Sequence, residues 1–305
     1  MQNTIPIVLI SDDNYCLATS VAVESIIRNK KPETNYEIYI LGIDISKENK
    51  DRLESQSKDK AKVTILEFEN KYKDINYSHS YISKVLFFKF DVANIFSQYN
   101  KIIYLDGDIA VNGDLTEFFE TDLGNNYAGV VKDLILFSKK QHQIINTESY
   151  FNAGVMLLNA KKIREENLYP KFLEELTTHN YEHSDQDVFN IMFNKQAKFL
   201  SLKFNFISLY YMFNKSDINS QEELNDFKTS AKQPIIIHYA GDKPWNLKKG
   251  KKFEIWKKYF KLSPYKKEKL KWQKNKKMFE FDFSEERKKI RLFGLGFSFK
   301  CGDKH

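Results

Sequence analysis

Strands and helices alternate from the first residues of the chain. Residues 5–10, 36–41 and 63–68 are apolar runs of strand type. A segment with helical spacing at residues 16–28 separates the first two runs, and a polar helix that opens at Ser46 follows the second. Repeats of strand, helix and strand predict right-handed crossovers and a parallel sheet. Ligands bind such sheets where the strands end, so the residues after the first strand lie in a candidate binding site.

The length and apolar content are those of an ordinary globular protein. The 305 residues suffice for one large domain or for a domain with an appendage. The longest apolar runs, such as residues 6–10, are far too short to span a bilayer. The N-terminus lacks the pattern of a signal peptide, so we expect a cytoplasmic protein. Cys16 and Cys301 lack the spacing of metal ligands, which indicates free thiols.

Charge is distributed unevenly along the chain. Residues 248–305 carry 20 Lys and Arg against 7 Asp and Glu, a net charge of +13. The remaining 28 basic and 34 acidic residues leave residues 1–247 with a net charge of −6. We therefore expect a mildly acidic body, residues 1–247, and a separate basic region, residues 248–305. Such a basic region indicates an anionic partner, either membrane lipid or nucleic acid.

Two carboxylates stand one residue apart in the segment 101–111. Asp106 and Asp108 follow an apolar run of strand type, with Gly107 between them. Alternation along a strand would place both carboxylates on one side, and the absence of a side chain at Gly107 would allow a ligand to approach the backbone. Paired carboxylates suit a hard divalent cation that also holds a phosphorylated ligand. The alternative is a β-hairpin, because Asp-Gly is also a common hairpin turn.

Later segments of the chain have the patterns of further helices and strands. Residues 83–96 and 160–178 have helical spacing, and we expect each to form one helix. The predicted later strands are 127–131, 150–159, 199–202 and 234–237.

Five blocks together resemble the glycosyltransferases of family eight, which include bacterial lipopolysaccharide galactosyl- and glucosyltransferases and the glycogenins. The resemblance covers roughly residues 5–260 and implies an α/β GT-A fold (Rossmann-like, nucleotide-binding) for residues 1–247. To that we add a mainly helical, basic C-terminal appendage. The blocks are Asp12-Asp13-Asn14-Tyr15, Asp106-Gly107-Asp108, Phe151-Asn152-Ala153-Gly154, Ser184-Asp185-Gln186-Asp187 and His238-Tyr239-Ala240-Gly241-Asp242-Lys243-Pro244-Trp245.

The resemblance implies a divalent metal, Mn²⁺ or Mg²⁺, at the diphosphate of a UDP-sugar. Asp106 and Asp108 would be metal ligands, and His238 would be the third. Gly241 would meet the diphosphate through its backbone, and Lys243 would act on it as a point charge. Taken alone, His238 could equally be a satisfied polar residue at a strand end, and Lys243 could be a solvated surface charge.

The same resemblance assigns the nucleotide end of the site. Asp12 would accept the imide N–H of uracil, Tyr15 would stack on its face, and Asn14 would lie beside them. Ile82 would lie at the edge of the nucleotide. Lys89 stands where the bacterial enzymes usually carry Arg near the donor sugar, and Lys cannot make the planar bidentate contact. The alternative for residues 12–15 is a helix N-cap.

Four residues would surround the transferred sugar. Asp133 and Asn152 would bind donor or acceptor hydroxyls, Asp185 would bind the donor sugar, and Gln186 would lie opposite the leaving UDP. The alternatives are a helix cap for Asp185 and Gln186 and a turn for Asn152. Because Gln186 is an amide and a poor nucleophile, we favour front-face attack over double displacement.

The basic region interleaves Lys and Arg with aromatic residues in segments 251–260, 266–272 and 287–299. This composition fits helices that lie on an anionic membrane surface, where each Lys or Arg contributes about 1 kcal/mol. We therefore expect peripheral attachment to the inner face of the cytoplasmic membrane. A solvated face or a disordered end is the alternative. No nucleic-acid motif accompanies the charge, so we expect no nucleic-acid partner.

The prediction is a retaining, metal-dependent hexosyltransferase. It would move galactose or glucose from a UDP-sugar to a hydroxyl of an oligosaccharide or lipo-oligosaccharide acceptor, in lipopolysaccharide synthesis. The alternatives are a glycogenin-like self-glucosylating enzyme, a non-catalytic saccharide-binding module of the same fold, and a two-metal phosphoryl-transfer or nucleic-acid enzyme.

Overall fold

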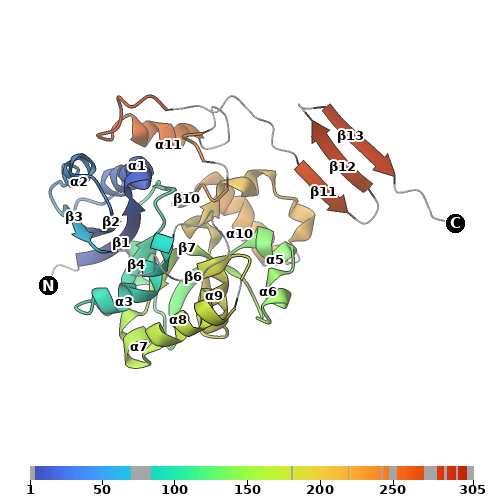
Figure 1. Cartoon of the computed structure of the whole chain (residues 1–305), viewed down its shortest axis with the longest axis horizontal. Helices are drawn as coiled ribbons and strands as arrows, with labels where there is room; N and C mark the ends of the chain where they lie inside the picture. The colour runs from blue at the N-terminus through green and yellow to red at the C-terminus, as the bar shows by residue number, and fades with distance from the viewer. Residues whose placement is uncertain are drawn as a thin grey trace.

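The computed structural model describes residues 4–69, 84–179, 181–218, 220–241, 243–246 and 253–270, and the strands at 280–284, 287–292 and 295–300 (Figure 1). The strands of the body are β1 (Thr4–Asp12), β2 (Asn35–Ile43), β3 (Ala61–Glu67), β4 (Ile102–Leu105), β5 (Ile109–Val111), β6 (Ala128–Lys132), β7 (Phe151–Leu158), β8 (Ala197–Leu200), β9 (Phe206–Ile207) and β10 (Ile236–His238). The α-helices are α1 (Cys16–Arg28), α2 (Lys47–Glu54), α3 (Val92–Ile95), α4 (Thr116–Glu120), α5 (Leu134–Ser138), α6 (Gln141–Ile144), α7 (Ala160–Glu165), α8 (Leu168–Thr178), α9 (Ser184–Met192), α10 (Gln221–Lys232) and α11 (Phe253–Phe260). Short 3₁₀ helices are η1 (Asp13–Tyr15), η2 (Lys84–Asp91), η3 (Leu202–Phe204), η4 (Ser208–Met212) and η5 (Lys215–Asp217).

A seven-stranded sheet with the order β3-β2-β1-β4-β7-β6-β8 forms the centre of the body. β1 pairs in parallel with β2 and β4, and β2 pairs in parallel with β3. This confirms the parallel sheet predicted from the first 70 residues. β7 runs antiparallel between β4 and β6, which no sequence pattern indicated. A small second sheet has the order β5-β10-β9.

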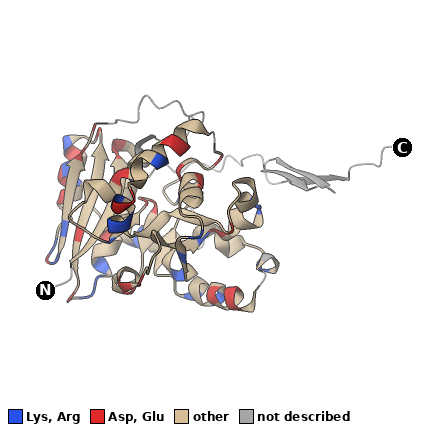
Figure 2. Ribbon diagram, turned by 90° about the horizontal axis from the view of Figure 1, so that it is seen from below, with Lys and Arg blue, Asp and Glu red and all other residues tan. Residues whose placement is uncertain are grey.

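The central sheet separates two apolar cores. Ile7 and Leu9 of β1 pack in the core that contains α1, α11 and the small sheet. Val8 and Ile10 point to the other face, which η2, α3, α7, α8 and α9 cover. Successive side chains of a strand point to opposite faces, so a strand buried on both faces is apolar throughout, as residues 5–10 are. Charged segments of both signs are interspersed on the helices outside these cores (Figure 2).

Two predicted helices are wrong in detail. Residues 84–91 form the 3₁₀ helix η2 before the short α3, and Phe87 stacks on Phe90 three positions later, with ring centroids 6.2 Å apart. The predicted helix 160–178 is two helices, α7 and α8. Asn167 between them is left-handed with φ 50°. Pro170 in the first turn of α8 cannot continue a helix from α7, and Asn tolerates the left-handed turn that restarts it.

The start of the basic region packs against the body. α11 buries Trp256 and Tyr259 in the α1 core, and the Tyr259 hydroxyl accepts a 2.7 Å hydrogen bond from Asn29 Nδ2. The prediction that segment 251–260 lies on a membrane is therefore wrong for α11, because its apolar face is covered. The division between residues 247 and 248 stays a prediction, and this packing favours a boundary after residue 270.

The later part of the basic region contains a three-stranded antiparallel sheet. β11 (Glu280–Ser284), β12 (Arg287–Leu292) and β13 (Leu295–Lys300) pair in that order (Figure 1). The prediction of a mainly helical appendage is wrong for these residues. Alternation of Phe with polar residues in 280–284 and 297–300 is the period of a strand. Among the described residues, no helix is both long and apolar enough to cross a membrane.

Candidate active site

The Asp106-Gly107-Asp108 segment connects the two sheets of the body. Asp106 follows β4 of the central sheet, and Asp108 precedes β5 of the small sheet. The Asp106 amide donates to Gly154 O over 2.8 Å, and the Tyr239 amide donates to Asp108 O over 2.9 Å. β4 and β5 do not pair with each other, so the hairpin alternative is wrong. The segment instead presents both carboxylates between β7 and β10.

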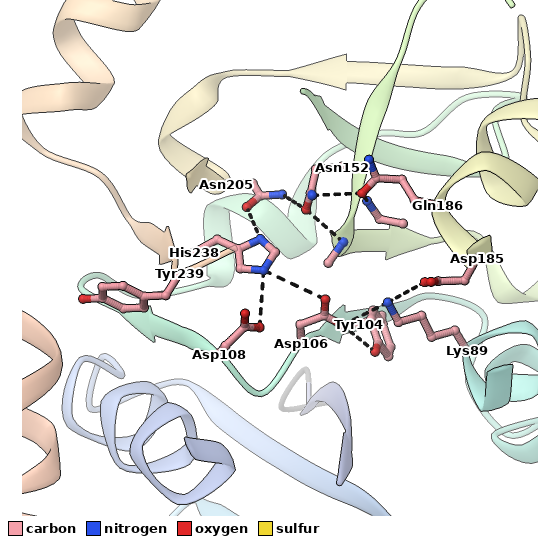
Figure 3. Close-up of polar contacts among 12 residues, drawn as sticks. Lys89, Tyr104, Asp106, Asp108, Asn152, Asp185, Gln186, Asn205, His238 and Tyr239 are labelled. Atoms are coloured by element: carbon pink, nitrogen blue, oxygen red, sulfur yellow. Dashed lines mark hydrogen bonds and ion pairs between the residues drawn. The ribbon is translucent and has the colours of Figure 1, made fainter. Parts of the chain in front are cut away.

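Asp106, Asp108 and His238 form a cluster that we call the metal trio. One ligand atom from each lies within 4.8 Å of the other two. His238 Nε2 lies 3.3 Å from Asp108 Oδ1 and 3.9 Å from Asp106 Oδ2 (Figure 3). Two carboxylates and an imidazole are a donor set that Mn²⁺ accepts. Among the described residues, no other group of three or more His, Cys, Asp or Glu side chains lies close enough together to hold a metal ion.

A partner residue fixes the orientation of the His238 ring. His238 Nδ1 lies 3.1 Å from Asn205 Oδ1, and Asn205 Nδ2 donates to Asn152 Oδ1 over 2.9 Å. Because the amide nitrogen of Asn205 is used toward Asn152, its oxygen faces His238 and accepts the Nδ1 proton. Nε2 is thereby directed at the two carboxylates, the arrangement that metal-bound histidines require. The residues present fit a divalent metal.

Gly154 leaves space beside the trio. A Cβ at this position would lie 2.3 Å from His238 Cε1 and 2.7 Å from Asp106 Oδ2. No other residue type fits there without moving a proposed ligand. Gly107 has a different role from the one expected, because a Cβ there would meet Thr19 Oγ1 at 2.8 Å and the Tyr15 ring at 3.1 Å. The space at Gly107 is occupied by protein side chains.

The hydrogen bonds continue from Asn205 to the far wall of the site. Asn152 Nδ2 donates to Gln186 Oε1 over 2.9 Å, and Gln186 Nε2 donates to Asp133 Oδ2 over 3.4 Å. The order His238, Asn205, Asn152, Gln186, Asp133 is therefore a chain in which every donor points the same way. Figure 3 shows its first four members. We call it the amide relay. It joins the metal trio to the predicted sugar-binding residues.

Lys89 bridges the trio to Asp185. Its buried Nζ lies 3.0 Å from Asp106 Oδ1 and 2.7 Å from Asp185 Oδ2. The Tyr104 hydroxyl also donates to Asp106 Oδ1, over 2.8 Å. One oxygen of Asp106 is thus held by Lys89 and Tyr104, and the other faces His238. Burial lowers the pKa of a lysine, but the charges of Asp106 and Asp185 outweigh it and raise the pKa of Lys89, so it carries a positive charge.

The carboxylates of the site differ in their pKa values. Burial would raise the pKa of Asp108, but the charges and hydrogen bonds of His238 and Lys243 hold it well below its usual range. Burial raises the pKa of Asp133 and of Asp185, and Lys89 opposes the effect at Asp185. Lys243 reaches Asp108 Oδ2 directly and also donates to Tyr239 O over 3.1 Å.

These groups surround a cavity of about 560 Å³, which we call the site cavity. Its walls include Lys89, Asp106, Asp133, Asn152, Gly154, Asp185, Gln186 and Gly241. Gly241 is left-handed with φ 94°, and a Cβ there would approach Leu209 Cδ1 to 3.0 Å. Ser184, directly before Asp185, is also left-handed with φ 51°, a strained conformation for serine.

The structure tests the two helix-cap alternatives, one for Asp185 and Gln186 and one for residues 12–15. No side-chain hydrogen bond caps α9, so the cap that was the alternative for Asp185 and Gln186 is wrong, although both residues do lie in the polar first turn of this helix. Asp185 pairs with Lys89, and Gln186 accepts from Asn152. Asp12 does cap η1, since its Oδ1 accepts from the Tyr15 amide over 3.0 Å. Asn14 is exposed beside it. Ile82 lies outside the described residues.

Sequence reasoning missed two residues of this site, Asn205 and Tyr104, and the steric role of Gly154. Asn205 is 1% exposed and interrupts the otherwise apolar pattern Phe204 to Ile207. A buried Asn between aromatic residues requires partners, which was the available signal.

The chain matches a known family over most of its length. Residues 6–249 match the family model described as Glycosyl transferase family 8. The chain belongs to this family. As a member of family 8 it is an enzyme of sugar transfer, which confirms the family expected from the five blocks.

Relatives of the chain include named glycosyltransferases. A putative glycosyltransferase of Haemophilus influenzae is 30% identical over 255 residues, which cover 80% of this chain and 74% of that protein. A lipopolysaccharide 1,2-glucosyltransferase of Escherichia coli is 26% identical over 247 residues, covering 77% and 71% of the two chains.

Solved structures share the fold. The galactosyltransferase LgtC, in complex with donor and acceptor sugar analogs, has a TM-score of 0.75 and 25% identity, covering 85% of this chain and 96% of that one. The glycosyltransferase GlyE of Streptococcus pneumoniae has a TM-score of 0.63 and 26% identity, covering 85% and 60%. The GT-A glycosyltransferase fold predicted for the body is confirmed.

Proposed function

We propose that this family 8 enzyme transfers a hexose, galactose or glucose, from a UDP-sugar to a hydroxyl of a lipo-oligosaccharide acceptor, with retention of configuration. The observation that carries the proposal is the metal trio at the edge of the site cavity. A relative named as a lipopolysaccharide glucosyltransferase and a structural neighbour that binds donor and acceptor sugar analogs support the substrate class.

Asp106, Asp108 and His238 would hold Mn²⁺ or Mg²⁺, which when bound neutralises the departing diphosphate. Lys243 pairs with Asp108. We expect its ammonium to turn to the diphosphate when the donor binds, because the diphosphate carries more charge than one carboxylate. Asp12, Asn14 and Tyr15 would bind uridine, with Gly107 packed beneath the Tyr15 ring. Gly241 would let its backbone approach the diphosphate.

The hydrogen bonds of Gln186 bear on the route of retention. Its Oε1 accepts from both Asn152 Nδ2 and the Ala153 amide, over 2.9 and 3.2 Å. Both lone pairs of this oxygen are therefore engaged, which weakens an already poor nucleophile. Front-face departure and attack needs no protein nucleophile and is the route we favour. A covalent sugar trapped on Asp185 or Gln186 would contradict it.

The central test is release of UDP in a donor screen. We expect release from UDP-galactose or UDP-glucose with Mn²⁺ and truncated lipo-oligosaccharide acceptors, and less from UDP-N-acetylhexosamines. UDP binding should strengthen with Mn²⁺ in the wild type and in Asp59→Ala, an exposed acid outside the site, but not in Asp108→Ala. If no UDP-sugar supports release with any divalent metal, the proposal fails.

Two other functions have distinct outcomes in the same screen. A glycogenin-like enzyme would add hexose to its own chain, which intact-mass measurement after incubation with UDP-glucose would detect. A non-catalytic module would bind saccharide and release no UDP beyond slow hydrolysis. The intact metal trio and the amide relay favour catalysis over the module.

We propose further that the enzyme acts at the inner face of the cytoplasmic membrane. Because α11 and the residues up to 270 are packed on the body, attachment would come from later residues, which include Lys271, Lys274, Lys276 and Lys277. Vesicles with anionic lipid should retain the wild type more than a variant with Lys271, Lys274, Lys276 and Lys277 changed to Glu, and added salt should weaken retention. Equal retention of both proteins would exclude this attachment.

A further inference from the structure

A second cavity, of about 820 Å³, lies beside the site cavity. Its walls come from the ends of β6 and β8, the start of α5, η3 and the first turns of α10, and Figure 1 shows α5 and α10 at the same end of the body. Lys132 and Leu134 line this second cavity, whereas Asp133 between them lines the site cavity. One stretch of backbone is therefore a wall of both.

The common wall is held in place by hydrogen bonds. The Tyr210 hydroxyl donates to Lys132 O over 3.1 Å and accepts from the Leu134 amide over 3.0 Å. Across the second cavity, Lys132 Nζ lies 2.6 Å from Glu223 Oε1, and Asp226 Oδ2 accepts from the Leu202 amide over 2.8 Å. Contacts within the protein thus hold the walls of the second cavity in place.

The side chains of the second cavity suit a neutral, hydroxyl-rich ligand. Three carboxylates, Glu222, Glu223 and Asp226, face a single ammonium, Lys132, so a nucleotide or phosphate would be repelled. Carboxylates and the serine hydroxyls at 149, 201 and 220 can accept hydrogen bonds from sugar hydroxyls.

Phe199 adds an aromatic face to this set. Its side chain is 43% exposed, and its ring packs on Phe151 with centroids 6.5 Å apart. The other aromatic ring, Phe137, is covered by Lys132 Nζ at 3.8 Å and by the stacked His142 ring at 4.2 Å. Phe199 is therefore the ring in this cavity that the C–H face of a hexose can stack on.

We propose that the second cavity binds neutral hexose units of the acceptor that lie away from the hydroxyl receiving the sugar. The inference rests on the proposed function, because it takes the ligand of the site cavity to be a saccharide. Its volume falls in the range of small-ligand sites, about 300–1,000 Å³. The consequence is a preference for longer acceptors over short ones.

The first experiment measures transfer to neutral acceptors of two to six hexose units at saturating UDP-sugar and Mn²⁺. In the wild type, KM should fall as the acceptor lengthens. Phe199→Ala should raise KM for the longest acceptor about fivefold and leave KM for the shortest unchanged, with kcat constant. Leu262→Ala, which removes a side chain that is also 43% exposed and does not line the cavity, should change neither.

Two further measurements keep the outcome decisive. Glu222→Gln alters an exposed carboxylate of the cavity wall without touching the core and should raise KM for long acceptors in the same way. Saturation-transfer NMR with the same oligosaccharides, without donor, should detect binding to the wild type and weaker binding to Phe199→Ala. If transfer fails but this binding difference is found, the proposed function is wrong and the cavity assignment stands. A KM independent of length, or equal binding to both proteins, overturns the inference.

Discussion

At the scale of single residues, Gly154 decides whether the metal trio can form. The trio has no room for an added methyl group, which would overlap His238 Cε1 and Asp106 Oδ2. We expect Gly154→Ala to weaken Mn²⁺ binding at least about tenfold, because second-shell changes at metal sites cost about 10–100-fold. Calorimetric titration with Mn²⁺ measures this.

The matched control is Gly113→Ala. A Cβ at Gly113 would meet Ile235 at an ordinary 3.5 Å, so the same chemical change is expected to leave Mn²⁺ binding intact. Equal Mn²⁺ affinity in Gly154→Ala and Gly113→Ala would show that the trio is not the metal site.

Substitutions of Asn205 can test its contact with His238 separately from its contact with Asn152. Asn205→Asp keeps an acceptor for His238 Nδ1 but removes the donor to Asn152, whereas Asn205→Leu removes both. We expect Asn205→Leu to lose about 10–100-fold in Mn²⁺ affinity and Asn205→Asp to keep it, since carboxylates often orient metal-bound histidines. Asn205→Asp should nevertheless transfer sugar slowly, because Asn152 and Gln186 lose their alignment. Wild-type Mn²⁺ affinity in Asn205→Leu would contradict the relay.

Residue-scale prediction from the sequence succeeded where a residue type is chemically demanding. Asp106, Asp108 and His238 were predicted to be metal ligands, and the structure places their side chains close enough together to hold one ion. Asn205 was not, because an isolated Asn is as typical of a turn as of a buried network. The pairing of Lys243 with Asp108 could not be predicted either, since it depends on how β10 lies beside β5.

At the scale of elements, α11 behaves as part of the body. Trp256 is fully buried, so Trp256→Ala should lower the free energy of unfolding by about 3–5 kcal/mol. Lys258→Ala on the exposed side of the same helix should change it by less than about 0.5 kcal/mol. Denaturant unfolding followed by circular dichroism measures both. Unchanged stability in Trp256→Ala would show that α11 belongs to a separate appendage and not to the body.

A second element-scale prediction concerns the junction of β2 with the loop before α4. Asp114 Oδ2 accepts from the Lys31 amide over 2.8 Å and from the Tyr36 hydroxyl over 2.9 Å. Burial would raise the pKa of Asp114, but hydrogen bonds from Thr116, Lys31 and Tyr36 outweigh it and lower the pKa. The ionised form therefore stabilises the fold above the unfolded pKa of about 3.9, and that contribution is lost as pH falls through the folded value.

Asp114→Asn should accordingly lower the thermal midpoint at pH 7 by roughly 2–4 °C, and the difference from the wild type should shrink below about pH 4. Asp59→Asn, at an exposed position, should track the wild type at every pH. A difference that stays constant down to pH 3 would show that the charge of Asp114 is not involved.

Strands were easier to predict than helices. Strand β1 is an apolar run buried on both faces, and the first half of β2 alternates buried with half-buried residues, so both segments carry a clear strand pattern. Residues 84–95 and 160–178 have the apolar spacing of a helix. That spacing does not reveal the 3₁₀ helix in which Phe87 lies, nor the break between α7 and α8 at Asn167 and Pro170. The sheet formed by residues 280–300 was missed because lysine and arginine content was given more weight than alternation.

At the scale of the whole molecule, the metal trio joins segments that are far apart in sequence. Asp108 and His238 are separated by 130 positions; Asp108 directly precedes β5, and His238 ends the neighbouring strand β10 of the small sheet. Unfolded chains cannot form the trio, so a metal should bind the folded state alone. Mn²⁺ at 100 times its Kd would then add about 2.7 kcal/mol of stability, a rise of roughly 5–10 °C in Tm.

Scanning calorimetry with and without Mn²⁺ tests this coupling. Asp108→Asn should show little or no rise, and Asp59→Asn should show the full one. An equal rise in Asp108→Asn would mean that Mn²⁺ binds elsewhere on the folded chain.

Three rings form a contact series from the predicted nucleotide end to α11. Tyr15 packs edge-on against Trp245 with centroids 5.6 Å apart, and Trp245 lies 5.8 Å from Trp256. The chain has only three tryptophans, and two of them belong to this series. A base that stacks on Tyr15 would change the surroundings of Trp245, and hence its emission. If the donor binds at Tyr15 as proposed, Trp245 would report donor occupancy by its intrinsic fluorescence, with neither a label nor turnover.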